Sequence, residues 1–119
     1  MMSDNPIEIT HVSGDLDFYF GDKRIITYNI KNTGVYTIDR LKIEAVTIKK
    51  HDSLPTSSNY VETISEFSDI MAKGESQNFD ITIKIPENFN ETYICEEGGK
   101  PVHAPIKLKI NANYTQIIK

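Results

Sequence analysis

The chain has 119 residues, with 13 Lys plus Arg against 17 Asp plus Glu and a formal net charge of −4. This length predicts a single domain over residues 1–119, large enough for one core without metal or disulfide staples. The acidic balance provides no overall attraction to nucleic acid or anionic lipid, so we expect neither as a partner. The single cysteine, Cys95, excludes an internal disulfide and leaves the compartment open.

The N-terminal segment carries no recognisable targeting signal. Residues 1–9 lack a basic start followed by an apolar run, and no window approaches the roughly 18 consecutive apolar residues of a membrane span. We therefore expect no direct membrane insertion. The doubled Met1-Met2 suggests a vector-derived Met in front of an excised soluble piece whose anchor was removed. On that interpretation the domain is extracellular or on the cell surface, and an intact cytosolic chain is the alternative.

Apolar residues recur at every second position, which is the period of a β-strand. In chain order, the expected strands cover residues 7–11, 26–30, 41–48, 79–85 and 106–112, with weaker candidates at 60–65 and 93–95. Their Ile-rich alternation is typical of half-buried pleated strands. After Ala45, the apolar Val46 and Ile48 predict that the inward face switches there or that both faces become covered.

Turn residues separate these strands. In Asn32-Thr33-Gly34 we expect Gly34 to take a positive φ and Asn32 to bond its own following backbone, and Pro86 should end the strand before it. Residues 65–71 are expected to form one helical turn. About seven short strands with regular turn signals predict an all-β fold, a single antiparallel immunoglobulin-like β-sandwich. Its expected core is Ile26, Tyr28, Ile30, Leu41, Ile43, Phe79, Ile81, Ile83, Ile106, Leu108 and Ile110.

Two parts of the chain resemble a known family. Residues 26–34 with 41–45, and residues 70–75 with 79–86, are similar to immunoglobulin-like domains of the cell-adhesion-related (CARDB-like) type in bacterial and archaeal surface proteins. In those domains a strand ends in an Asn-x-Gly turn, and a later Gly-Glu turn introduces a strand closed by Pro. The soluble domains of archaellum stator proteins have a comparable layout, which implies a surface-layer or envelope protein as partner. An arrestin-like sandwich is the rival resemblance, over residues 79–110.

Few residues carry catalytic chemistry. Cys95 with His103 suggests a copper or iron site, but the further His and Met ligands that such sites need are missing. No nucleophile elbow occurs, and no local signature links Cys95 to a histidine. Asp15, Asp17 and Asp22 offer oxygen ligands to calcium, although EF-hand spacing is absent and carboxylates facing water are the simpler interpretation. We expect no catalytic residue, no metal, no cofactor and no enzyme.

One candidate partner site is aromatic. Phe18, Tyr19 and Phe20 cannot all point inward from one strand, so at least Tyr19 should lie on the opposite face. There it would contact protein or sugar unless a loop covers it. The acidic segment 90–99 is a second candidate, since long sandwich loops often carry binding.

The last strand is the preferred interface. If residues 106–112 form a sheet edge, their backbone groups can pair with another chain, and Lys107 and Lys109 would guard against indiscriminate pairing; an interior strand is the alternative. Ile117 and Ile118 in the tail are exposed unless something covers them. These features predict a homodimer through a sheet edge or face. The expected function is a non-catalytic extracellular or cell-surface assembly module that binds protein, with a cytosolic arrestin-like adaptor or a carbohydrate-contacting accessory domain as alternatives.

Overall fold

Two antiparallel sheets build the fold in the computed structural model, which describes residues 6–49, 59–87, 96–97, 100–101, 104 and 106–118. The first sheet has the order β1 (Ile7–Ser13), β2 (Lys23–Asn32), β5 (Ser76–Lys84) and β4 (Val61–Ile64). The second pairs β3 (Thr37–Lys49) with β8 (Ile106–Ile117). A separate short pair joins β6 (Glu96–Glu97) and β7 (Lys100–Pro101). The all-β sandwich is therefore confirmed, with six principal strands where the sequence predicts about seven.

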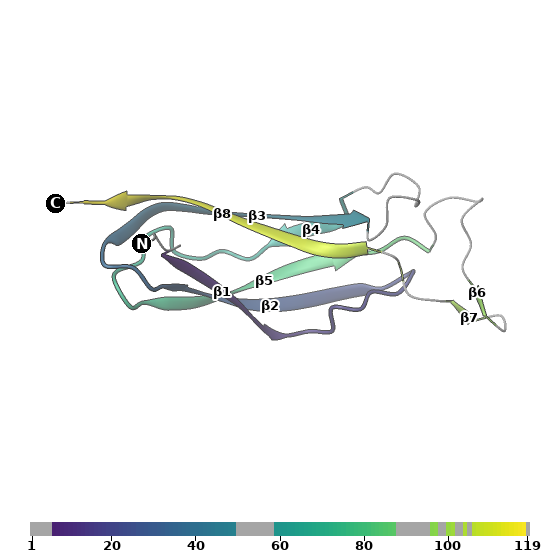
Figure 1. The fold of residues 1–119 in the computed structure, drawn as a ribbon. Helices are drawn as coiled ribbons and strands as arrows, with labels where there is room; N and C mark the ends of the chain where they lie inside the picture. Colours follow the sequence, from purple (N-terminus) through teal and green to yellow (C-terminus); the bar gives the residue numbers. More distant parts are fainter. Residues whose placement is uncertain are drawn as a thin grey trace.

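The two sheets form the two layers of an elongated sandwich, with β3 and β8 over β1, β2 and β5 (Figure 1). β3 lies on the β4 side, because the segments flanking β4 bond to it: Ile38 exchanges backbone bonds with Met71, and the Tyr60 N–H donates to the Thr47 hydroxyl. β8 therefore lies on the β1 side. β8 ends where the turn between β2 and β3 lies, which is called the tip end below (Figure 1).

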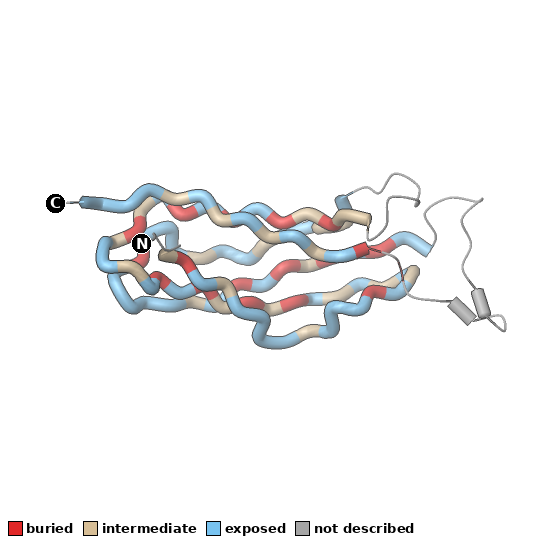
Figure 2. Tube along the Cα trace, in the orientation of Figure 1, coloured by how far each residue is buried: buried red, intermediate tan, exposed pale blue. Residues whose placement is uncertain are grey.

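The core lies between the layers and follows the inward-facing row of each strand (Figure 2). Nine of the predicted core residues are buried, and Leu108 and Ile110 are half-buried. Their partial exposure follows from β8's position at the margin of a two-stranded layer. The predicted core omitted Ile85, which continues the alternation of residues 79–83, and several buried residues that lie outside any predicted alternation: Phe18, Ile38, Met71 and Ala104.

The inward face of β3 does not switch at Val46. The inward-facing row continues through the buried Thr47. Val46 and Ile48 on the other face are half-buried, so the alternative expectation, that both faces become covered, holds in part. The switch lies earlier in the strand. Arg40 has a φ of 57°, and the pairing with β8 shifts by one residue there, which lets both Ile38 and Leu41 point inward.

The turn after β2 is built around Asn32, whose side chain is fully buried at 0% exposure. Its Oδ1 accepts a hydrogen bond from the Gly34 N–H at 3.0 Å, which confirms the predicted local bond. Its Nδ2 donates to the carbonyls of Tyr36 at 2.8 Å and Met71 at 3.0 Å, so the side chain ties three segments together.

Two local predictions are wrong. Gly34 does not take a positive φ; glycine is needed there because a Cβ would lie 2.7 Å from the Cβ of Pro6. Residues 65–71 form no helical turn and instead run as irregular chain between β4 and the bridge of Met71 with Ile38. In this segment Ser68 bonds the side chain of Gln77, an anchor that no local pattern indicates.

The burial of Tyr28 on β2 makes the stability of the fold depend on pH in the alkaline range. Its ring stacks on Phe79 at 6.0 Å and meets His11 edge-on at 5.5 Å, and desolvation by burial raises the pKa of the Tyr28 phenol. An acid with a raised folded-state pKa stabilises the fold below its unfolded pKa, about 10, and that contribution is lost as pH rises through the folded pKa.

We therefore expect Tyr28→Phe to lose less stability than the parent chain between about pH 9 and pH 11.5, the range around the tyrosine pKa. Urea unfolding at both pH values measures the two losses. An equal alkaline loss in both proteins would contradict a role for this phenol.

Candidate functional site

One edge of β8 pairs with β3, and the direction of the β3 backbone groups shows what the other edge presents. Ile38 exchanges both of its backbone bonds with Met71, on the side away from β8. Its neighbour on β8, Gln116, is therefore in a non-hydrogen-bonded pair, and the N–H and C=O of Gln116 point away from β3. The Leu41 N–H also points away from β8, toward the carbonyl of Asp69 at 3.0 Å.

The alternation extends along the whole of β8, because the extra residue at the bulge belongs to β3. The N–H and C=O groups of Leu108, Ile110, Ala112 and Gln116 therefore project from the edge opposite β3. Among the described residues, no strand pairs with β8 on that side. The prediction that this strand is a sheet edge is thus supported over the alternative of an interior strand.

The side chains of β8 divide this edge into two parts. Lys107 and Lys109 are exposed on the outer face, where they can guard the first part of the edge. From residue 110 to residue 118 the chain carries no charge. The inward-facing Ile110 and Ala112 are only half-buried. An uncharged, half-buried edge of this kind is a template for pairing with another strand.

An apolar patch adjoins β8 at the tip end. Ile117 pairs with Thr37, which places it beside the turn that carries Val35 and Tyr36. Val35 is 69% exposed and Ile118 is 65% exposed. Val35, Tyr36, Thr37 and Ile117 line an open depression of about 510 Å³. We call Val35, Tyr36, Ile117 and Ile118 the tip patch. The sequence analysis identified its two isoleucines but not Val35 and Tyr36, which could have been found only from their position in an exposed turn.

The aromatic segment lies at the other end of the sandwich, near the start of β8. Phe18 is buried and its carbonyl accepts a hydrogen bond from the Ala104 N–H at 2.6 Å, while Tyr19 is 36% exposed. The predicted opposition of these two residues is confirmed. Phe20 is half-buried and Leu16 is exposed, so Tyr19 is the main exposed aromatic ring of the three and the segment is no continuous strand. Within one molecule, the tip patch and Tyr19 lie at opposite ends.

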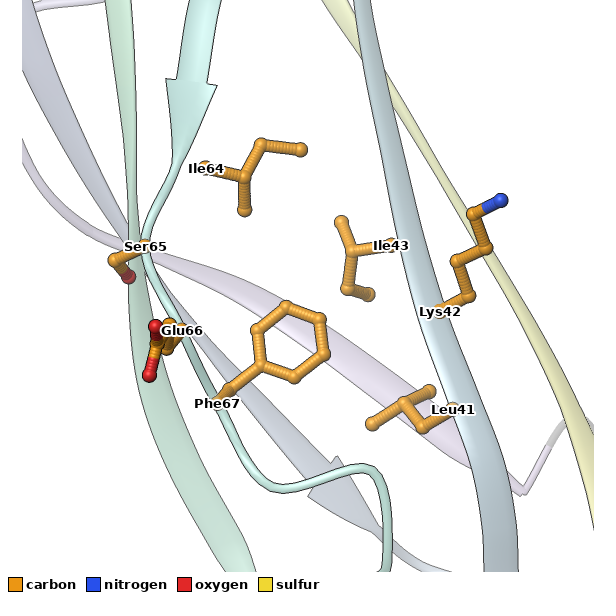
Figure 3. Close-up of a pocket in the computed structure, with 7 residues that line it drawn as sticks. All are labelled: Leu41, Lys42, Ile43, Ile64, Ser65, Glu66 and Phe67. Carbon is orange, nitrogen blue, oxygen red and sulfur yellow. The ribbon is translucent and has the colours of Figure 1, made fainter.

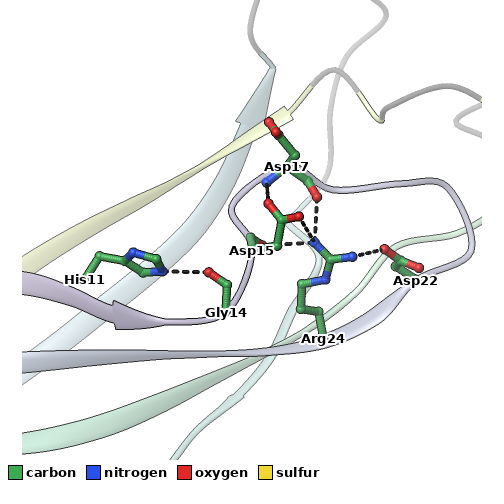
Figure 4. Close-up of polar contacts among 6 residues, drawn as sticks. All are labelled: His11, Gly14, Asp15, Asp17, Asp22 and Arg24. Atoms are coloured by element: carbon green, nitrogen blue, oxygen red, sulfur yellow. Dashed lines mark hydrogen bonds and ion pairs between the residues drawn. The ribbon is translucent and has the colours of Figure 1, made fainter.

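The aspartates that the sequence offers to calcium gather around an arginine instead (Figure 4). Arg24 donates to the backbone carbonyls of Asp15 at 3.0 Å and Asp17 at 2.6 Å, and it pairs with the carboxylate of Asp22 at 2.6 Å. The guanidinium thus supplies the positive charge that this loop binds. Its role is to hold the connection between β1 and β2, which positions Phe18 in the core.

A second depression, of about 400 Å³, lies between β3 and the segment after β4. Leu41, Ile43, Ile64 and Phe67 face one another across it, while the polar ends of Lys42, Ser65 and Glu66 point away (Figure 3). It therefore offers no group for acid-base or nucleophilic chemistry.

Within the described ranges, no group of three or more His, Cys, Asp or Glu side chains could hold a metal ion. Cys95, His103, the expected strand at 93–95 and most of the acidic segment 90–99 lie outside the described residues.

The β8 surface, defined as the open edge of β8 together with the tip patch, is the best-supported candidate site. It combines backbone groups that no described strand pairs with and exposed apolar side chains that adjoin them at the tip end. No helix in the described part of the chain is long and apolar enough to cross a membrane. Comparison of the chain with known protein families, with curated proteins and with solved structures finds no match.

Proposed function

We propose that this domain is a non-catalytic assembly module that binds protein through the β8 surface. The observation that carries the proposal is the open edge of β8, which presents backbone donors and acceptors along an uncharged stretch. Addition of a strand to such an edge supplies main-chain hydrogen bonds for affinity, and neighbouring apolar side chains supply specificity. The tip patch extends this edge with side chains that are exposed in the single chain.

The finer proposal is an extracellular or cell-surface role, with a surface-layer or envelope protein, or a second copy of the chain, as partner. Its support is the resemblance to CARDB-like domains, including those of the archaeal motility apparatus, carried by the turns at residues 32–34 and 73–75. A carbohydrate-contacting role has less support, because Phe18 is buried and Phe20 is half-buried. A cytosolic arrestin-like adaptor would share the sandwich but has no residue-level support.

Site-specific photocrosslinking tests this function. A photoreactive amino acid replaces Asn113, which is exposed on the outer face of β8, and in a matched protein it replaces Glu62, which is exposed on β4. We expect discrete protein adducts from position 113, in concentrated purified protein or in an extract of the source cells, and none from position 62. Absence of adducts at both positions, or equal adducts at both, would contradict a protein-binding role for the β8 surface.

A further inference from the structure

We infer that the occupant of the β8 edge is a second copy of this chain, with the two β8 strands antiparallel about a twofold axis. The inference rests on the proposed function and names its partner. Pairing of this kind would join the two-stranded layers into one sheet with the order β3-β8-β8-β3. The argument depends on three properties of the edge that make it complementary to itself.

The first property is the spacing of the backbone groups. Leu108, Ile110, Ala112 and Gln116 all project their N–H and C=O groups from even-numbered positions, so an antiparallel copy presents the same groups at matching intervals. A twofold axis that passes at Asn111 or at Ala112 aligns projecting residues with projecting residues. The first register sets Ile110 opposite Ala112, and the second sets Leu108 opposite Gln116 and Ala112 opposite itself.

The second property is the charge pattern. With the axis at Asn111, Lys109 faces Asn113 and Lys107 faces Thr115 of the other copy. With the axis at Ala112, Lys109 faces Thr115 and Lys107 faces Ile117 of the other copy. No lysine meets a lysine, because both lie in the first part of the strand and the second part is uncharged. A parallel, in-register pair would instead set the lysines side by side, and like charges directly opposite are destabilising.

The third property is the position of the exposed apolar residues. Antiparallel pairing brings the tip end of one copy beside the start of β8 in the other. The Phe18 carbonyl bonds Ala104, two residues before β8, so the exposed Tyr19 lies next to that start. Ile118 of each copy would therefore approach Tyr19 of the other. Two patches that lie apart within one molecule become two equivalent contacts, as an interface with twofold symmetry requires.

Solution mass by light-scattering-coupled gel filtration tests the inference on the full chain. We expect the parent chain to be a dimer and Asn111→Lys/Asn113→Lys to be a folded monomer. The dissociation constant of the dimer should be at least tenfold larger for the variant than for the parent chain. This double variant places like charges opposite each other in both registers. Glu62→Lys is the matched control, because it changes the net charge by the same amount on exposed β4, and it should remain a dimer.

A mixing experiment separates the loss of β8 self-pairing from every other reason why the double lysine variant could be monomeric. Asn111→Glu/Asn113→Glu mixed with the double lysine variant should form a mixed dimer, detected by native mass spectrometry. With the axis at Ala112 both introduced glutamates face lysines, and with the axis at Asn111 two of the three charged pairs are of opposite sign. A parent chain that is monomeric up to about 1 mM, the weak end of the affinity scale, would overturn the inference, as would a dimer that the lysine variant and Ile117→Lys leave intact. If protein adducts still form at position 113 while the chain stays monomeric, the proposed function stands and only the second copy is wrong.

Discussion

Asn32→Leu is expected to lower the free energy of unfolding by about 2–5 kcal/mol, because it removes three hydrogen bonds made by a fully buried amide. The Asn32 amide accepts from the Gly34 N–H and donates to the carbonyls of Tyr36 and Met71, and the Asn32 side chain is 0% exposed. Leucine has a similar volume but can replace none of these bonds. Urea unfolding monitored by circular dichroism measures the loss.

Asn32→Asp separates lost hydrogen bonds from lost volume. The introduced carboxyl keeps the acceptor for Gly34 but faces two carbonyl oxygens, which should raise its pKa in the folded state. A raised folded-state pKa means that the variant is relatively stable below the unfolded value of about 3.9 and loses that stability as pH rises. We expect its deficit against the parent chain to grow from pH 4 to pH 7, while the deficit of Asn32→Leu stays constant. Equal pH dependence in both variants would contradict the donor role of Nδ2.

Asn111→Pro and Ala112→Pro are expected to differ sharply, although the two residues are adjacent on β8. The Asn111 N–H points toward β3, so proline there removes a ladder bond and strands its acceptor, at a cost of about 3 kcal/mol or more. The Ala112 N–H projects from the open edge, where proline is tolerated. We expect only about 1 kcal/mol of loss at that position, from the adjustment of φ.

Thermal and urea unfolding of both proline variants test the direction of the backbone groups without reference to any partner. If Ala112→Pro is the more damaging of the two, the assignment of the open edge is reversed. In the proposed dimer, Ala112→Pro has a further consequence. It should weaken self-association while leaving the single sandwich folded.

Strand positions were largely predictable, because the alternation of apolar residues is a local property. Residues 26–30, 79–85 and 106–112 each lie within an observed strand or extend one residue beyond it. The prediction of which residues face inward on these strands was correct for the same reason. The weak candidate at 60–65 also corresponds to a strand, β4. The helical turn predicted for residues 65–71 was wrong because the residues that anchor this segment, Gln77 and Ile38, lie elsewhere in the chain.

The candidate site was predictable only in part. Lys107, Lys109, Ile117 and Ile118 were identified because strand alternation and a polar-to-apolar tail are visible locally, and all four are exposed. Val35 and Tyr36 were missed, since their place beside Ile117 depends on the pairing of Thr37 with a residue eighty positions later. The gathering of three aspartates around Arg24 was missed for a similar reason, because a loop must fold back before those atoms meet.

The alternation of apolar residues is enough to predict an all-β sandwich and the inward face of each main strand, because a period of two is visible without knowledge of neighbouring strands. The open edge of β8, in contrast, is visible only once the sheets are assembled. That property depends on which strand lies on each side, and β3, the one strand that pairs with β8 among the described residues, is far away in the chain. The burial of Phe18, Met71 and Ala104 was decided at the same level, because irregular segments take their burial from what packs against them.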